Sequence, residues 1–273
     1  MKRETNNKDD VTARIGGISR LRIESDGPGI RTLVALSGCR LDCAYCINRH
    51  LRLDAVGTLT EPEELLEQVK IDDIYFQFSG GGITFGGGEP LLKADYILRF
   101  RQICPPEWTI AVETSLNVPE EVVELLVGIV DYWIVDIKEM DPGRYLEYTG
   151  TTNEQVLANL KTLREQCASS RVRVRVPRIP GLNKQEDVDR SVSEIRAMGF
   201  AAETFSYDIP DNFKKQFMDR DLLPGSLIAP GEEVAESDRE RSEIRHGFLK
   251  GVFTIFTSPL VGVMDTDDEN WTD

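Results

Sequence analysis

The sequence predicts an α/β fold whose sheet is built mainly from parallel strands. Short runs rich in β-branched residues alternate with longer amphipathic segments, which is typical of βα units. Polar motifs follow several of these runs, and 273 residues is the length of one large domain. The pattern fits an open doubly wound sheet or a barrel. Both place ligand sites at the carboxyl ends of their strands.

Six strands are expected, each followed by a helix. The expected strands are 32–36, 83–85, 109–112, 132–137, 171–176 and 202–207. The expected helices are 62–69, 94–103, 119–126, 153–165, 184–198 and 237–250. Thr60, before Glu61 and Pro62, has the chemistry of a helix N-cap that is followed by proline in the first turn.

Three of the five cysteines, Cys39, Cys43 and Cys46, follow the first expected strand with the spacing C-x₃-C-x₂-C. Three thiolates hold a [4Fe–4S] cluster one ligand short, which leaves one iron open to a substrate. A Cys₃His zinc site is the alternative, because His50 lies four residues after Cys46. The spacing alone leaves both open.

The other two cysteines, Cys104 and Cys167, lie far from this loop and are expected to be ordinary buried or half-buried thiols. An odd and sparse cysteine count without a secretory signal predicts a reducing compartment, the cytoplasm. We expect no membrane span, because the most apolar stretch, 122–137, is short and carries charges.

The net charge of −15 disfavours nucleic acid as a partner, since phosphate binding needs a basic face. Part of the excess lies in an acidic C-terminal tail, expected over residues 258–273. Residues 1–14 are expected to form a polar N-terminal extension.

Two glycine-rich motifs flank the cysteine loop: SDGPGIRT at 25–32 and FGGGEP at 85–90. Consecutive glycines let the backbone approach a ligand closely. Together with the cysteine spacing, these motifs resemble the radical S-adenosylmethionine (SAM) superfamily, and within it the activating enzymes of glycyl radical enzymes. The resemblance extends from about residue 15 to 255 and includes VETS at 112–115, VDIK at 135–138 and RVRVPRIPGLN at 173–183.

The resemblance implies a partial (β/α)6 parallel barrel over residues 15–257 that cleaves SAM reductively. A hydrogen atom would then be taken from a backbone glycine of a larger partner protein. Only 33 residues, none of them cysteine, separate Cys46 from Gly80, so this is the compact form without a ferredoxin-like insert.

The same resemblance assigns roles to individual residues. Cys39, Cys43 and Cys46 would hold the [4Fe–4S] cluster as the catalytic metal site. The further residues expected to contact SAM are Tyr45, Gly87, Gly88, Glu89, Glu113, Asp136, Lys138 and Arg175. Of these, Gly87, Gly88 and Glu89 would hold the methionine ammonium group. Asp136, Glu113 and Thr114 would frame a monovalent cation.

The implied partners are a glycyl radical enzyme as protein substrate and a flavodoxin or ferredoxin as electron donor, with the protein itself a monomer. Two alternatives stay open. One is a radical SAM enzyme that acts on another peptide or a small molecule. The other is a zinc-stabilised α/β binding protein, in which the two glycine-rich motifs would have no role.

Overall fold

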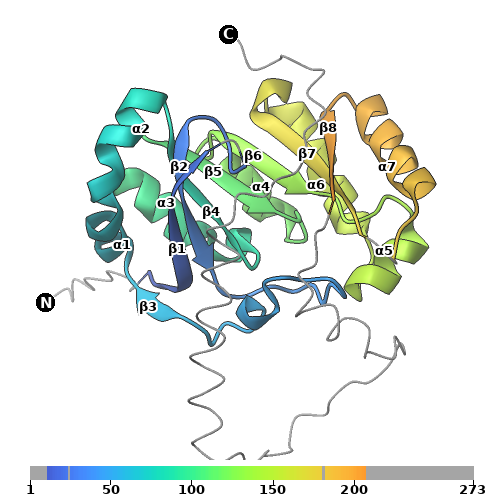
Figure 1. Ribbon diagram of the computed structural model, residues 1–273, viewed down its shortest axis with the longest axis horizontal. Helices are drawn as coiled ribbons and strands as arrows, with labels where there is room; N and C mark the ends of the chain where they lie inside the picture. The colour runs from blue at the N-terminus through green and yellow to red at the C-terminus, as the bar shows by residue number, and fades with distance from the viewer. Residues whose placement is uncertain (1–10, 24, 180–181, 207–273) are drawn as a thin grey trace, which may run out of the picture. The chain divides into compact units, whose positions relative to one another are not determined.

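The computed structural model of the protein describes residues 11–23, 25–179 and 182–206, which form alternating strands and helices (Figure 1). The strands are β1 (Ala13–Ile23), β2 (Ile30–Leu36), β3 (Thr58–Thr60), β4 (Gly82–Gly87), β5 (Thr109–Thr114), β6 (Tyr132–Asp136), β7 (Val172–Arg178) and β8 (Ala201–Ser206). The α-helices are α1 (Pro62–Val69), α2 (Asp73–Ser79), α3 (Ala94–Ile103), α4 (Glu120–Val127), α5 (Pro142–Thr149), α6 (Glu154–Gln166) and α7 (Gln185–Ala197).

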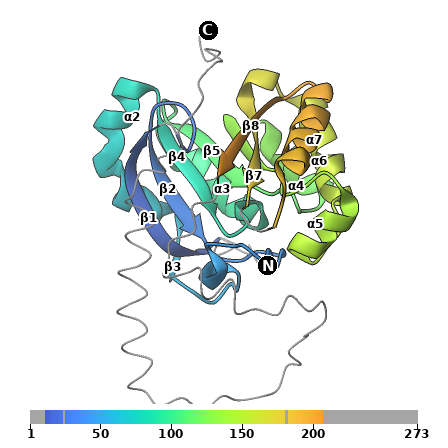
Figure 2. The same cartoon turned by 45° about the vertical axis from the view of Figure 1, so that its right-hand side comes forward.

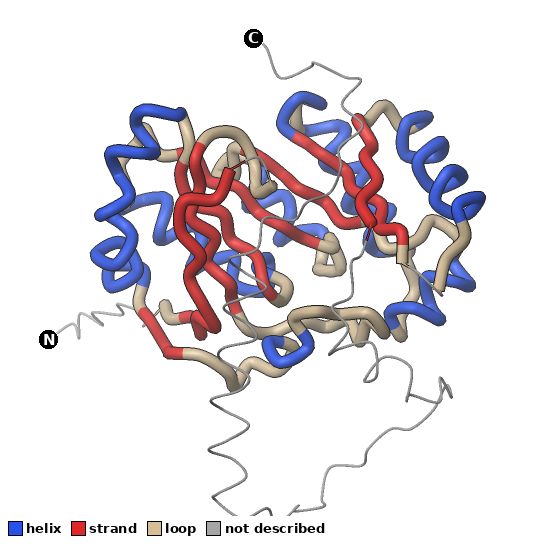
Figure 3. The backbone as a smooth tube through the Cα atoms, in the orientation of Figure 1, coloured by secondary structure: helices blue, strands red, loops and turns tan. Residues whose placement is uncertain are grey.

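Within these residues all strands belong to one sheet, in the order β3-β1-β2-β4-β5-β6-β7-β8 (Figure 3). The six strands β2, β4, β5, β6, β7 and β8 run parallel. β1 and β3 extend the sheet through antiparallel pairs beside β2. A sheet with six parallel strands is the partial barrel that we expected, and it brings the carboxyl ends of neighbouring strands to one edge.

The helices pack against the outer face of this sheet, with α1 and α2 near its β1 end and α7 beside β8 (Figures 1 and 2). The apolar core lies between helices and strands and includes Leu65, Phe100, Leu160 and Ile195, each fully buried. Strands β2 and β4 are buried along almost their whole length, as expected for parallel strands covered on both faces.

The amino ends of the parallel strands are tied together by Arg31, which belongs to the SDGPGIRT motif and is fully buried. Its guanidinium donates to Thr84 Oγ1 at 2.6 Å and to the carbonyl of Ile83 at 2.6 Å. It also donates to Thr109 Oγ1 at 2.8 Å and to the carbonyls of Thr109 at 3.0 Å and Pro28 at 3.1 Å. One side chain therefore joins the turn before β2 to the starts of β4 and β5.

All six expected strands are present, and five of the six expected helices lie within two residues of their expected bounds. The sixth expected helix, 237–250, lies outside the described residues. We did not expect the antiparallel pair β1 and β3 or the helices α2 and α5. The N-cap of α1 is Glu61 rather than Thr60, and the backbone N–H of Glu61 donates to the Glu64 carboxylate at 3.0 Å. That reciprocal contact outweighs the preference for threonine.

Among the described residues, no helix has the length and apolar character that a membrane span requires. Strand β1 begins at Ala13, inside the segment 1–14 that we expected to be an extension. The expected boundaries at 257 and 258 lie outside the described residues. Cys104 and Cys167 are buried at the ends of α3 and α6, as expected.

Candidate functional site

The three cysteines lie in the loop that leaves the carboxyl end of β2, with Cys43 buried and Cys39 and Cys46 half-buried as free thiols. Backbone hydrogen bonds fix this loop on helix α5. The Asp42 N–H donates to the carbonyl of Thr149 at 3.0 Å, and the Ala44 N–H donates to that of Tyr148 at 2.9 Å. The loop is thus held by a second element, although it has no regular structure of its own.

Burial raises the pKa of all three thiols, to about 12 for Cys39 and about 11 for Cys43. A metal takes the thiolate form, so binding must displace these protons. Among residues 11–23, 25–179 and 182–206, no three or more His, Cys, Asp or Glu side chains are arranged to hold a metal ion.

The glycine-rich turn at the end of β4 is bonded directly to the cysteine loop. Gly88 N–H donates to the Leu36 carbonyl at 2.8 Å and Glu89 N–H to that of Gly38 at 2.7 Å. In return, Asn48 Nδ2 donates to the carbonyl of Gly87 at 3.0 Å. A Cβ at Gly88 would stand 2.3 Å from the Gly38 carbonyl oxygen, so only glycine permits this approach.

The Glu89 carboxylate is buried and accepts four hydrogen bonds. Thr114 Oγ1 and Ser115 Oγ each donate at 2.6 Å, the Ser115 N–H at 2.9 Å and the Leu91 N–H at 3.3 Å. Burial raises the pKa of Glu89, and these donors only partly oppose the rise. Both oxygens are engaged by the protein, so Glu89 fixes the end of β5 against the end of β4.

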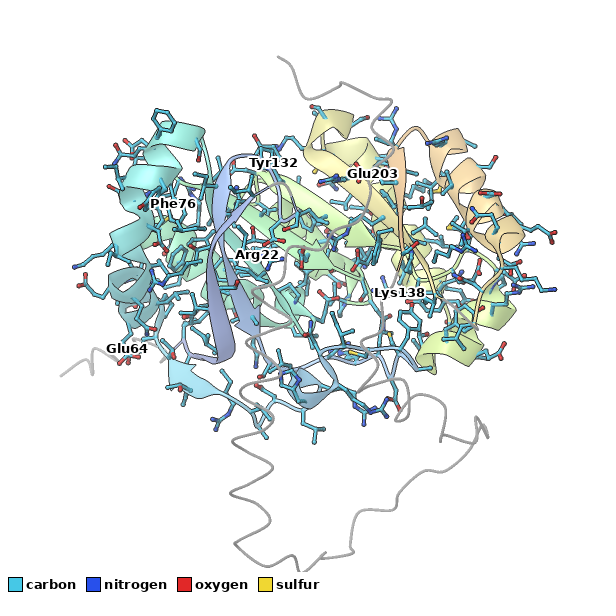
Figure 4. All side chains as sticks on the ribbon, in the orientation of Figure 1. Arg22, Glu64, Phe76, Tyr132, Lys138 and Glu203 are labelled. Atoms are coloured by element: carbon cyan, nitrogen blue, oxygen red, sulfur yellow. The ribbon has the colours of Figure 1, made fainter. Side chains whose placement is uncertain are left out.

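A second cluster, the charged network, lies on the inner face of strands β5, β6 and β7. Asp136 and Arg175 are direct partners across β6 and β7, and Arg175 Nε donates to Asp136 Oδ1 at 2.7 Å. Arg175 also contacts Glu113 Oε1 at 3.3 Å, while Lys138 Nζ donates to Asp136 Oδ2 at 3.3 Å. Adjacent to these, Arg22 of β1 pairs with Asp26. Figure 4 labels Arg22, which belongs to β1, and Lys138, which follows the end of β6.

The two carboxyl groups of this network titrate differently. Burial raises the pKa of Glu113 to about 7, against the opposing charge of Arg175. Burial acts on Asp136 in the same direction, but Arg175 and Lys138 outweigh it and lower the pKa below its usual value. Asp136 is therefore the permanent negative charge at this point, and Glu113 gains or loses its proton near neutral pH.

The expected cation site stays a prediction. Within the charged network, the Arg175 guanidinium contacts both Glu113 and Asp136. The hydroxyl of Thr114, the residue after Glu113, donates a hydrogen bond to Glu89. Successive side chains of a strand point to opposite faces, which separates Thr114 from Glu113.

Tyr45 is buried between two of the cysteines in sequence, and its ring meets that of Tyr148 edge to face, with centroids 6.4 Å apart. Sequence reasoning did not single out Ser115, Arg22 or the α5 tyrosines, although the structure places all of them around the expected site. Ser115 belongs to the VETS motif, and Asp141 followed by Pro142 marks the start of α5, whereas no pattern in the sequence pointed to Arg22.

Fold and site together define a class of protein: a parallel barrel that carries a three-thiol loop and a glycine-rich turn at the carboxyl ends of neighbouring strands. The sequence model of the radical SAM superfamily matches residues 33–193. The chain belongs to this superfamily and, within it, to the glycyl-radical-enzyme activating enzymes. Radical SAM enzymes use a [4Fe–4S] cluster together with SAM.

The choline trimethylamine-lyase activating enzyme of Oleidesulfovibrio alaskensis is 29% identical over 267 residues, covering 76% of this chain and 82% of that protein. The benzylsuccinate synthase activating enzyme of Thauera aromatica is 32% identical over 228 residues, or 60% and 68% of the two chains. Among solved structures, Streptococcus suis SuiB bound to S-adenosylmethionine matches with a TM-score of 0.50 at 13% identity, over 80% of this chain and 45% of SuiB. At that identity, SuiB supports the fold alone.

Proposed function

We propose that the protein is an activase that cleaves SAM reductively and removes a hydrogen atom from a backbone glycine of a partner glycyl radical enzyme. The observation that carries the proposal is the direct bonding of the cysteine loop to the glycine-rich turn, through Gly88, Glu89 and Asn48. This contact brings the only three-cysteine motif of the sequence to the carboxyl edge of the barrel, next to the charged network.

Cys39, Cys43 and Cys46 hold the cluster in this proposal, and the residues present fit it. Three free thiols share one loop, and that loop is anchored through its backbone rather than through the thiols. The buried hydroxyl of Tyr145 beside them has no hydrogen-bond partner among the described residues. When bound, the cluster supplies one electron to SAM, whose cleavage yields methionine and the 5′-deoxyadenosyl radical that takes the glycine hydrogen.

The methionine end of SAM carries an ammonium and a carboxylate, and the charged network offers both complements. Asp136 faces the ammonium, while Lys138 and Arg175 supply positive charge to the carboxylate. Gly87 and Gly88 have no side chains, so their backbone can come close to the methionine end of SAM. Glu89 acts through the strand end that it fixes, because its four hydrogen bonds leave it no free acceptor for the ammonium.

The remaining assigned residues support these groups. Tyr45 lies between two of the cluster cysteines and fills the space against Tyr148, which excludes water from the loop. Glu113 balances the charge of Arg175 next to Asp136. Neither role requires a bound cation.

The named relatives activate choline trimethylamine-lyase and benzylsuccinate synthase, and we propose a protein partner of the same kind for this chain. A flavodoxin or ferredoxin would supply the electron. We further propose a cytoplasmic, monomeric activase whose catalytic domain spans residues 15–257.

The proposal is tested by following the hydrogen atom. The anaerobically reconstituted protein is incubated with SAM, a reductant and a candidate glycyl radical enzyme whose glycines carry deuterium at Cα. We expect deuterium in the 5′-deoxyadenosine, measured by mass spectrometry. Unlabelled 5′-deoxyadenosine formed at full yield would favour a different peptide or small molecule as substrate. Stoichiometric zinc without iron uptake would favour the binding protein.

A further inference from the structure

The hydroxyl of Tyr145 is a polar group that the fold buries and leaves unused. The side chain is fully buried, and within the described residues its Oη has no hydrogen-bond partner. Burying a hydroxyl without a partner costs about 1–3 kcal/mol. Such a group in a native interior therefore calls for an explanation.

Helix α5, which carries this hydroxyl, contacts the cysteine loop directly. Tyr145, Tyr148 and Thr149 form the buried face of α5. The carbonyls of Tyr148 and Thr149 accept the backbone N–H groups of Ala44 and Asp42, which flank Cys43 on either side. The helix that carries the unpartnered hydroxyl is thus the same helix that holds the cysteine loop in place.

The ionisable groups that influence the Tyr145 hydroxyl belong to the cysteine loop and its surroundings. Burial raises the pKa of Tyr145 far above its ordinary value, and among the charged groups Cys43 contributes most to the rise. Lys138 opposes it, while Glu89 and Cys39 add to it. A neutral phenol is a hydrogen-bond donor, so the Tyr145 hydroxyl can donate to a group on the cysteine loop.

We propose that Tyr145 tunes the cluster by donating a hydrogen bond from its Oη–H to the thiolate sulfur of Cys43. This inference rests on the proposed function, because it requires the cluster on the cysteine loop. Hydrogen bonds to the sulfurs are among the factors that set the potential of an iron–sulfur cluster. A donor stabilises the more negative, reduced form, so Tyr145 raises the potential and eases reduction.

The proposal predicts that Tyr145→Phe does no harm to the stability of the metal-free protein but lowers the cluster potential of the reconstituted protein. In the metal-free protein, Tyr145→Phe removes an unsatisfied buried group and keeps the ring, so stability is unchanged or higher. In the reconstituted protein, the same substitution removes the hydrogen bond to sulfur and lowers the potential. A tyrosine needed only for packing or for stability would not produce this reversal.

The experiment compares wild type, Tyr145→Phe and Tyr96→Phe. Tyr96 is a buried tyrosine of α3 whose hydroxyl donates to the Glu61 carbonyl at 3.3 Å, so it serves as the control. Each metal-free protein is unfolded in urea, and each reconstituted protein is titrated anaerobically while the reduced cluster is followed by electron paramagnetic resonance.

We expect Tyr145→Phe to lose no stability when metal-free, and to bind as much iron as wild type. At a fixed potential its ratio of reduced to oxidised cluster should fall about tenfold, which is 59 mV for a one-electron couple. Tyr96→Phe should show the reverse: lower stability and an unchanged potential.

A fully loaded Tyr145→Phe protein with the wild-type potential would overturn the proposal, as would a loss of stability in the metal-free form. Both outcomes leave the proposed function intact. A wild-type protein that takes up no cluster would instead contradict the proposed function, and with it the role of Tyr145.

Discussion

Each end of the parallel strands carries an arginine, fully buried for Arg31 and half-buried for Arg175, and the partners of the two side chains differ. At the amino ends, Arg31 donates only to neutral carbonyls and hydroxyls, and burial lowers its pKa to about 10. At the carboxyl side, Arg175 contacts two carboxylates, Asp136 and Glu113, which outweigh burial and raise its pKa.

This difference in partners indicates that the amino ends of the strands serve stability and the carboxyl ends serve the reaction. The partners of Arg31 are neutral, so a charged ligand has no ion pair to displace there. Arg31 therefore acts as a structural clamp that holds the amino ends of the strands together. The ion pairs around Arg175 lie on the inner face, where a charged ligand can compete for them. We therefore expect substitutions at the amino ends to cost stability and substitutions at the carboxyl ends to cost activity.

The largest effect is expected for Arg31→Met. The change leaves the buried carbonyls of Pro28, Ile83 and Thr109 without their donor, at about 1–3 kcal/mol for each unsatisfied group. We expect the free energy of unfolding, measured in urea, to fall by roughly 3 kcal/mol or more. The control Arg164→Met removes one exposed contact, to the carbonyl of Met198, and should cost little. Similar losses in both variants would refute the clamp.

The next effect concerns two aspartates at opposite strand ends. Asp136→Asn removes the charge expected to face the SAM ammonium, a contact worth roughly 1.5–3 kcal/mol. The rate of SAM cleavage at low SAM concentration should fall between about tenfold and 150-fold. Asp131→Asn is the matched control, because an amide oxygen can still accept the Ile110 N–H that Asp131 binds at 2.8 Å. Equal rates in the two variants would remove Asp136 from the SAM site.

A smaller effect is expected for Gly88→Ala, which tests the contact between the glycine-rich turn and the cysteine loop. The new methyl group would collide with the Gly38 backbone, and overpacking of this kind costs roughly 1–3 kcal/mol. Iron uptake during reconstitution should fall with it. Gly128→Ala, where no atom lies within 4 Å of the new Cβ, should retain both stability and iron. Normal iron uptake by Gly88→Ala would show that the two loops assemble independently.

The smallest effect is a pH dependence of stability due to Glu113. Its pKa is about 7 in the folded protein, above its ordinary value, so the folded state binds the extra proton between these two values. The stabilisation is fully present below the ordinary pKa and is lost as pH rises through the folded-state value of about 7. Glu113→Gln should flatten this slope in urea unfolding at several pH values. An unchanged slope would assign the pH dependence to another group.

The parallel fold was predictable because the strands and helices of each βα unit have a recognisable local residue pattern. The helices at 62–69 and 94–103 are examples. The edge strands β1 and β3 escaped prediction because an antiparallel pair at a barrel edge depends on contacts distant in sequence. Helix α5 has the N-cap Asp141 and Pro142 in its first turn, a start signal that we did not use.

The candidate site divides in the same way. Cys39, Cys43 and Cys46 were recognisable because their spacing is local. The four hydrogen bonds to Glu89 and the placement of Arg175 between Glu113 and Asp136 arise only when separate strands meet.

The most direct test of the account is electron paramagnetic resonance of a candidate glycyl radical enzyme after anaerobic incubation with the reconstituted protein, SAM and a reductant. The account predicts a glycine-centred doublet on the partner, and its hyperfine splitting should collapse when that glycine carries deuterium at Cα. Full production of 5′-deoxyadenosine without a glycine-centred signal on any candidate partner would contradict it.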